Sequence, residues 1–378
     1  TAYGGATVDT ANFTIDTSDP SISAIATSAF SWGAYLNATE DNSNGTVSVT
    51  TTGVENGQTV TITLNGDTYT NTTTSNATTV TIPAADLQAL NNGSSYTMTA
   101  DVSDAAGNAA DQVTSSSFSV DTTAPTVSSF TMNDTALDSD DTATVTLVFS
   151  EAVTAFANAD ITVVNGSLST MTTSDNITWT GTYTPTADVE DTTNVLTLAT
   201  TYTDLAGNAG GAGQTANFEI DTLLPTITSI TSDTADGSYN LGDEINVIAT
   251  FSEAVSLSGG NFVITLDSGG TVTITSITSS TTANGTYTVG SGQTSADLTS
   301  SSIALSAGSL SDAAGNAMTD FSPSTNLAAG SALVIDTTAP TVSSFTMSDT
   351  ALKSGDTATV TLVFSEAVTA FANADITV

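Results

Sequence analysis

The chain has 378 residues and carries 39 acidic side chains against a single basic one, Lys353, for a formal charge of −38 at pH 7. This balance excludes nucleic acid as a partner, because phosphate binding requires Lys and Arg. The absence of cysteine excludes disulfides and thiolate metal sites. No run of about 18 apolar residues occurs, so we expect no membrane insertion.

One short phrase divides the chain into repeats. An apolar residue is followed by Asp-Thr, and a proline stands four residues after each Asp. The prolines are spaced by 105, 100 and 115 residues, a period that indicates tandem domains. Proline cannot donate to a strand ladder and keeps the preceding residue extended, so it defines where the next strand starts. The four prolines are Pro20, Pro125, Pro225 and Pro340.

Between the prolines, apolar residues alternate with Ser and Thr in short runs, which is the period of half-buried strands. About seven such runs per 100 residues, separated by turn residues, predict an antiparallel sandwich of immunoglobulin type. The chain is therefore predicted to be all-β, with tandem immunoglobulin-like antiparallel β-sandwich domains in an extended rod. Residues 84–90 are compatible with a single helical turn. We expect complete modules over 18–121, 122–221 and 222–336.

The two ends of the sequence repeat parts of the same plan. Residues 337–378 copy 122–163 with three differences in 42 positions, which predicts a truncated fourth module. Residues 1–17 parallel the stretch that ends at Asp221, and are interpreted as the last strand of a preceding module. The three differences are Asn133/Ser348, Asp138/Lys353 and Asp140/Gly355.

Oxygen-bearing side chains recur at three places in each module. In immunoglobulin strand order, the B–C and F–G loops share one pole, and the preceding linker arrives there. The B–C loops read Phe-Ser-Glu-Ala-Val at 149–153, 251–255 and 364–368, whereas the first module has Glu55 there. The F–G loops carry Asp-x-Ala-Gly-Asn at 104–108, 204–208 and 312–316. We expect these side chains to meet the Asp of the linker.

Two interpretations of these loops remain open. Carboxylate and amide oxygens from loops and linker could supply the 6–8 hard ligands of Ca²⁺, and Mg²⁺ is less favoured because the loops are flexible. Zn²⁺ is disfavoured without Cys or His. Alternatively, Asp-x-Ala-Gly-Asn is simply a good turn sequence. Because uncompensated carboxylates at one pole would raise each other's pKa, we favour calcium. Acidic A–B loops at the opposite pole are interpreted as solvated turns.

These phrases resemble the bacterial immunoglobulin-like repeats of giant secreted and surface adhesins. The resemblance implies an extender that places a distal binding domain away from the cell, with calcium stiffening each junction. It implies an extracellular or cell-surface location and neighbouring modules of the same chain as partners. The implied metal ligands are Asp16, Glu55, Asp104 and Asn108; Asp121, Glu151, Asp204 and Asn208; Asp221, Glu253, Asp312 and Asn316; and Asp336 and Glu366.

Two other functions were considered from the residues. A glycan- or cell-binding module would need exposed aromatic platforms, and other copies in a fibre or cell-surface glycans would then be partners. An enzyme is disfavoured, because the acidic clusters repeat in every module, as a catalytic site rarely does. The candidate platforms are Trp32, Tyr35, Trp179 and Tyr183.

Overall fold

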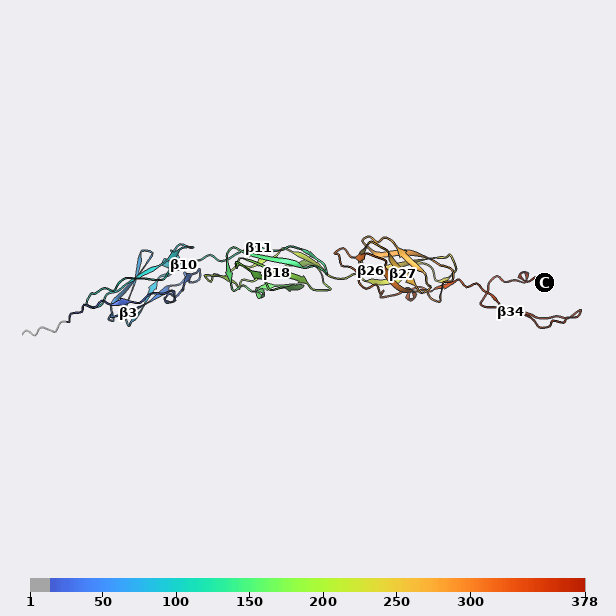
Figure 1. Ribbon diagram of the computed structural model, residues 1–378, viewed down its shortest axis with the longest axis horizontal. Helices are drawn as coiled ribbons and strands as arrows, with labels where there is room; N and C mark the ends of the chain where they lie inside the picture. Colours follow the sequence, from blue (N-terminus) through green and yellow to red (C-terminus); the bar gives the residue numbers. More distant parts are fainter. Residues whose placement is uncertain (1–13, 378) are drawn as a thin grey trace, which may run out of the picture. The chain divides into compact units, whose positions relative to one another are not determined.

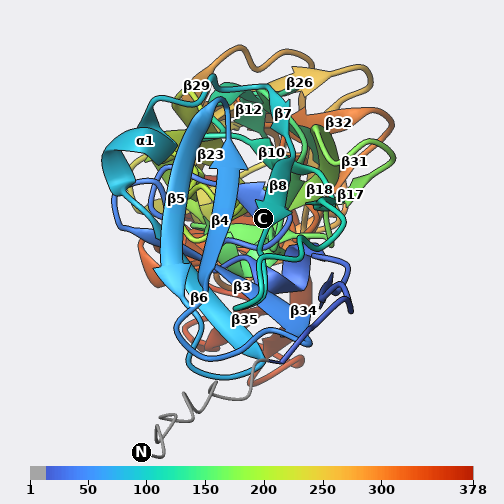
Figure 2. The same ribbon diagram turned by 90° about the vertical axis from the view of Figure 1, so that its left-hand side faces the viewer.

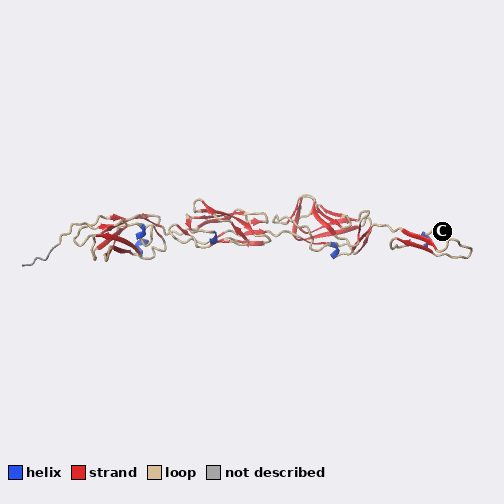
Figure 3. Cartoon of the chain, turned by 60° about the horizontal axis from the view of Figure 1, so that its bottom comes forward, coloured by secondary structure: helices blue, strands red, loops and turns tan. Residues whose placement is uncertain are grey.

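A computed structural model describes residues 14–377. Strands dominate and the few helices are single turns (Figure 3). No helix in the described range is long and apolar enough to cross a membrane. By its contacts the described part of the chain divides into two compact units, the first with residues 14–135, 141–186 and 191–219, the second with 136–140, 187–190 and 220–377.

The N-terminal part of the first unit packs three small sheets around one core. The sheets have the strand orders β1-β3-β6, β5-β4-β8-β9 and β2-β10-β7, and Figure 2 shows β5, β4 and β8 side by side. The elements are β1 (Ser21–Ile22), η1 (Thr27–Ala29), β2 (Tyr35–Leu36), β3 (Gly45–Thr52), β4 (Thr59–Leu64), β5 (Asp67–Thr72), β6 (Ala77–Ile82), α1 (Ala84–Gln88), β7 (Ser95–Tyr96), β8 (Met98–Asp101), β9 (Val113–Thr114) and β10 (Phe118–Val120).

The predicted alternation accounts for these strands. Val47 and Val49 on β3 and Ile62 on β4 are fully buried, while the Ser and Thr between them face outward or are half-buried. Successive side chains of a strand point to opposite faces, so period-two sequences cover one face with apolar groups. The single helical turn expected at 84–90 is confirmed as α1.

The rest of the first unit contains a larger sheet, β11-β13-β18-β16 with β17 on β18, and two smaller ones, β14-β21 and β15-β20-β22. Its strands β11 and β18 are labelled in the green part of Figure 1. The elements are β11 (Val127–Met132), β13 (Ala143–Phe149), β14 (Val153–Thr154), η2 (Asn158–Asp160), β15 (Ile161–Thr162), β16 (Gly166–Leu168), β17 (Thr172–Thr173), β18 (Thr178–Pro185), β20 (Thr197–Leu198), β21 (Thr203–Asp204) and β22 (Gly213–Gln214); β12 (Ala136–Leu137), β19 (Glu190–Asn194) and β23 (Phe218–Asp221) complete the strands of this stretch.

The second unit contains the sheets β24-β26-β29, with β32 on β26, β25-β33-β30 and β28-β27-β31. Their inward side chains form one hydrophobic core that includes Phe251, Phe262 and Tyr287. The elements are β24 (Ile227–Thr231), β25 (Gly237–Tyr239), β26 (Glu244–Ser258), β27 (Phe262–Leu266), β28 (Thr271–Ile274), β29 (Ser280–Thr288), β30 (Thr294–Ser295), β31 (Ser300–Leu305), β32 (Ser309–Ser311), η3 (Leu327–Ala329), β33 (Leu333–Asp336), β34 (Val342–Met347), β35 (Val360–Phe364) and η4 (Asn373–Asp375).

Two details differ from the expected sandwich. The pairs β2–β10 and β25–β33 are parallel, within otherwise antiparallel sheets. The segment 251–255, expected to be a loop, lies inside β26 as a register shift between Thr250 and Val255. The strand continues because its first half pairs with β29 and its last residues pair with β32, so the extra residues are accommodated as a bulge.

The sequence copy at 337–378 forms the same hairpin as its original. β34 pairs with β35 in the register of β11 with β13, and both pairs carry the same shift, after Val127 and Val342 respectively. The two hairpins differ in burial: Phe130 is 6% exposed, whereas its counterpart Phe345 is 58% exposed. Local sequence thus specifies the hairpin, whereas burial requires the strands that pack against it.

Candidate metal centre

The three Asp-x-Ala-Gly-Asn segments, here called the Asp–Asn loops, share three hydrogen bonds between their Asp and Asn, two to the Asp carboxylate and one between the backbones. In the first, Oδ1 of Asp104 accepts hydrogen bonds from the N–H groups of Gly107 and Asn108, both 2.8 Å, and Oδ2 accepts from Nδ2 of Asn108 at 2.8 Å. The backbone N–H of Asp104 donates to the carbonyl of Asn108, which closes a one-turn hairpin. The turn interpretation of this motif is therefore confirmed.

Each linker Asp adopts one repeated local geometry. Oδ1 of Asp121 accepts from the N–H two residues ahead, and Asp16, Asp221 and Asp336 do the same, at 2.9–3.2 Å. This is an Asx turn, in which the side chain replaces a backbone acceptor. The second carboxylate oxygen remains available, and the turn fixes where it lies as the chain enters the next repeat.

A serine orients the Glu of the Phe-Ser-Glu segments, a feature that sequence reasoning missed. Oγ of Ser150 accepts from the N–H of Thr126, and the N–H of Ser150 donates to the carbonyl of Thr126, both at 2.9 Å. Ser252 with Thr226, and Ser365 with Thr341, repeat both bonds. Because the Thr directly follows the linker proline, this pairing ties Glu to the linker.

The linker, the Phe-Ser-Glu segment and the Asp–Asn loop meet at two junctions. At the second junction, defined as Asp121, Glu151 and Asp204, one carboxylate oxygen of each residue lies within 4.8 Å of the others. The third junction, Asp221, Glu253 and Asp312, repeats this arrangement. The members of each group are half-buried or buried. Three carboxylates offer six oxygens, the donor type and number that suit Ca²⁺.

The electrostatics of both junctions are unfavourable for a cation-free cluster. Burial, with Asp121 and Asp204 adding repulsion, raises the pKa of Glu151. Burial, followed by repulsion from Asp312, Asp221 and Glu190, raises the pKa of Glu253 to about 6. The chain's only basic side chain, Lys353, belongs to neither group. A bound divalent cation would reverse this penalty, because opposite charge favours the ionised carboxylates.

The other predicted ligands are placed differently. At the first junction, defined as Asp16, Glu55 and Asp104, no such group forms among residues 14–377. Glu55 is exposed and accepts from the N–H of Ala105 at 2.8 Å, and Asp16 offers its backbone carbonyl to Nδ2 of Asn108 at 3.2 Å. Asp336 and Glu366 likewise join no group of three in the described part of the chain.

The loop asparagines use both ends of their amides in hydrogen bonds. Nδ2 of Asn208 donates to Oδ2 of Asp204 at 2.7 Å and to the backbone carbonyl of Asp121 at 2.9 Å, while Oδ1 accepts from the N–H of Ala38 at 2.9 Å. Asn316 makes the corresponding three bonds, at 2.8–2.9 Å. Their roles as metal ligands stay a prediction; their contacts are those of positioning groups.

One carboxylate at the third junction was not predicted. Glu190, at the start of β19, contributes repulsion to both Asp221 and Glu253. Sequence reasoning assigned no role to it because it lies in neither an A–B nor an F–G loop. In the sequence, Glu190 could be recognised only as one of two adjacent acidic residues, Glu190 and Asp191.

The aromatic platform expected for glycan binding is not available at Trp32. This side chain is 5% exposed and stacks on Phe30 with a centroid distance of 5.5 Å. Tyr183 is fully buried, and Tyr35 and Trp179 are half-buried. The insertion at 30–33 therefore fills the core of its own sandwich.

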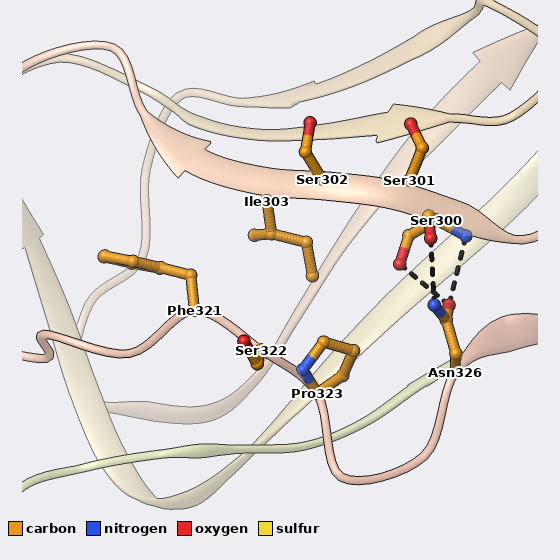
Figure 4. Close-up of a pocket in the computed structure, with 8 residues that line it drawn as sticks. All are labelled: Ser300, Ser301, Ser302, Ile303, Phe321, Ser322, Pro323 and Asn326. Carbon is orange, nitrogen blue, oxygen red and sulfur yellow. Dashed lines mark hydrogen bonds between the residues drawn. The ribbon is translucent and has the colours of Figure 1, made fainter.

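A separate groove of about 440 Å³ lies beside β31 in the second unit (Figure 4). Asn326 closes one end, because its Oδ1 accepts from the N–H and Oγ of Ser300 at 3.0 and 2.7 Å, and its Nδ2 donates to the Ser300 carbonyl. Ser, Phe, Ile, Pro and Asn line it, without an ionisable group. It offers neither a metal site nor acid–base chemistry.

Comparisons with known proteins give one family match. Residues 121–220 and 336–378 match the family model described as bacterial Ig-like domain. No curated protein matches the chain.

Several solved structures of adhesins are similar. A Ca²⁺-stabilised adhesin with which an Antarctic bacterium binds ice is 22% identical over 84% of this chain and 74% of its own, with a TM-score of 0.45. A structure concerned with host cell surface retention of a bacterial ice-binding adhesin is 20% identical over 84% and 98%, with a TM-score of 0.41. A bacterial immunoglobulin-like domain of the M. primoryensis ice-binding adhesin is 32% identical over 27% and 95%, with a TM-score of 0.21.

Proposed function

Because the chain belongs to the bacterial Ig-like domain family over residues 121–220 and 336–378, we propose that it is a structural extender of a bacterial cell-surface or secreted adhesin. In this role the repeats, with boundaries near 121, 221 and 336, space a binding domain away from its anchor. Calcium at the junctions between repeats stiffens the chain, and the location is extracellular.

One observation carries the proposal. The same three sequence positions, from the linker, the Phe-Ser-Glu segment and the Asp–Asn loop, form the same carboxylate group at the second and third junctions. A solvated acidic face needs no such repetition, and three close carboxylates without a cation oppose folding. The adhesin similarities agree with the proposed role but do not carry it.

The mechanism is a reduction of linker freedom. A cation bound by Asp121, Glu151 and Asp204 would connect the linker to two loops of the following repeat. The linker torsions that are otherwise free would then be fixed, and their ordering entropy would be offset by the binding free energy. When bound, the ion supplies charge neutralisation and coordination; the chain's own residues supply the geometry.

The test compares the chain in millimolar calcium with the chain in a calcium chelator. At a calcium concentration 100 times the dissociation constant, we expect about 2.7 kcal/mol of stabilisation per site, a rise of roughly 10–20 °C in melting temperature. Small-angle scattering should show a longer, less flexible chain with calcium than with chelator.

The matched control is the double variant Glu151→Gln, Glu253→Gln, which keeps the shape of both side chains but removes one charge from each group. We expect it to lose most of the calcium response. Identical scattering and melting with and without calcium in the unaltered chain would refute calcium stiffening, and an equal response to Mg²⁺ would refute the choice of ion.

A further inference from the structure

The turns that follow β2 and β12 provide a donor that the calcium sites do not use. Asn37 begins the first turn, and its Oδ1 accepts from the N–H groups of Thr39 and Glu40 at 2.9 and 3.0 Å. Asp138 begins the second, and its Oδ1 accepts from the N–H of Asp140 at 2.9 Å. In both turns the next residue, Ala38 or Ser139, directs its backbone N–H out of the turn, because the capping side chain is satisfied by later donors.

These outward N–H groups meet the Asp–Asn loop of the following repeat. Ala38 donates to Oδ1 of Asn208 at 2.9 Å, and Ser139 donates to Oδ1 of Asn316 at 2.8 Å. The residues of the two pairs are 170 and 177 positions apart in sequence. At the first pair, Nδ2 of Asn37 also donates to the carbonyl of Ala206 at 2.9 Å.

The asparagine amide has one allowed orientation. Its NH₂ faces an Asp side-chain oxygen and the linker carbonyl, both acceptors, and its Oδ1 faces a backbone donor. A reversed amide would place NH₂ against N–H and oxygen against carboxylate, leaving every contact repulsive. Asn208 is 4% exposed and Asn316 1%, so water cannot replace these partners.

The glycine before each asparagine provides clearance. An added Cβ would lie 3.2 Å from Nδ2 of Asn37 at Gly207, and 2.7 Å from Oδ2 of Asp138 at Gly315. At Gly107, in the first Asp–Asn loop, nothing lies within 4 Å of such a Cβ. All three have positive φ, so the conformation explains glycine everywhere, but close approach of a preceding turn occurs at two of the loops.

We propose that Asn208 and Asn316 are interlocks, meaning hydrogen-bonded contacts that dock the second and third Asp–Asn loops on the turn of the preceding repeat without a metal ion. The partner surface is the outward N–H of Ala38 or Ser139 together with the linker carbonyl. This refines the proposed extender role, since the interlock defines the docked arrangement that calcium then stabilises. The two contributions are separable because the interlock uses no oxygen of Glu151 or Glu253.

The experiment measures docking in chelator, where calcium cannot contribute. The chain has no cysteine, so Ser48→Cys and Thr180→Cys, on exposed positions of β3 and β18, introduce a unique pair for spin labels. Double electron–electron resonance then reports the distribution of distances between the two labels. The unaltered background should give one narrow principal distance in chelator.

Two variants each remove one partner of the hydrogen bond between Ala38 and Asn208. Asn208→Ala removes the amide, and Ala38→Pro removes the N–H that donates to Oδ1 of Asn208. Asn208→Ala removes two hydrogen bonds to the preceding turn and linker, so we expect it to broaden the distribution and lower the ratio of docked to undocked chains roughly tenfold. Ala38→Pro removes one hydrogen bond and leaves the buried Oδ1 of Asn208 without its donor, so we expect a loss of the same order. Ala38→Pro leaves all carboxylates in place, so added calcium should partly restore the narrow distance.

The matched controls are Asn108→Ala and Leu241→Pro. Asn108 belongs to an Asp–Asn loop without a preceding turn among the described residues, and Leu241 follows Asn240 in the corresponding turn and is 61% exposed. Neither should change the distribution between the labels. Unchanged distributions for Asn208→Ala and Ala38→Pro in chelator, or an already broad distribution in the unaltered background, would overturn the interlock whatever calcium does.

Discussion

The Asp–Asn loops at 104–108 and 204–208 differ in surroundings far more than in sequence. Both carry an Asp whose carboxylate accepts from the backbone and side chain of the Asn four residues later. In the first loop Asn108 is only half-buried, whereas Asn208 is 4% exposed. The second loop has a carboxylate group and a docked turn around it, and the first has neither in the described range. The loop is thus a local structure, and the contacts around it depend on the distant segments that pack against it in the described part of the chain.

The largest expected effect is a difference in stability between the variants that remove the Asp of each loop. Asp204→Ala leaves the backbone N–H of Asn208 and one N–H of its amide without an acceptor in a buried position and removes a proposed calcium ligand, so we expect a loss of about 3 kcal/mol in calcium. Asp104→Ala should cost less, because Asn108, its hydrogen-bond partner, is only half-buried and no ligand of the two proposed calcium sites is lost. Urea unfolding of both variants checks this, and an equal loss would contradict the comparison.

Removing the charge of Glu151 should change the stability of the chain in opposite directions with and without calcium. Glu151→Gln removes a partly buried charge and relieves repulsion from Asp121 and Asp204, so we expect added stability in chelator. In calcium we expect a loss of about 1–2 kcal/mol, because a proposed ligand is weakened. Glu55→Gln at the first junction is the control and should show no sign change. Thermal melts in the two buffers suffice, and the same sign in both would argue against a metal.

The pH dependence should distinguish the third junction. The raised pKa of Glu253, about 6, lies above its ordinary value of 4.5, so the folded metal-free chain binds a proton more tightly than the unfolded chain. Stability from this group is fully present below about pH 4.5 and is lost as the pH rises through about 6, on the order of 1 kcal/mol after solvent screening. Calcium affinity should fall over the same window as the pH is lowered.

Melting in chelator from pH 4.5 to 7.5 measures this dependence. Glu253→Gln should flatten the part that this group contributes. If the metal-free chain instead became steadily more stable from pH 5 to 7, and Glu253→Gln did not alter this, the repulsion assigned to Glu253 would be contradicted.

The smallest expected effect concerns Glu190, which was absent from the predicted set. Glu190→Gln removes one source of repulsion on Asp221 and Glu253, and should lower the pKa of Glu253 slightly and add a few tenths of a kcal/mol in chelator. Carboxyl chemical shifts followed against pH measure this. The exposed Glu219→Gln is the control, and an equal shift of Glu253 in it would deny Glu190 a specific role.

Much of the candidate site was accessible from the sequence because its parts are local. The Asx turn of each linker Asp and the hairpin of each Asp–Asn loop depend on hydrogen bonds spanning two to four residues. The convergence of the linker with the B–C and F–G segments followed from the strand order of the predicted fold. The bulge inside β26 did not follow, because it depends on which strand each half of β26 pairs with.

The sequence alone specified the repeats, the alternating strands and the short turns, since each of these is decided by neighbours a few residues away. Only the tertiary structure decided that Trp32 is core, that Glu190 faces the third junction, and that Asn208 and Asn316 bind a turn about 170 residues earlier. The copy at 337–378 illustrates the physical reason. It forms the same hairpin as the original, but its apolar side chains, such as Phe345, stay exposed. Burial, charge repulsion and shared hydrogen bonds belong to pairs of distant segments, and no local pattern contains them.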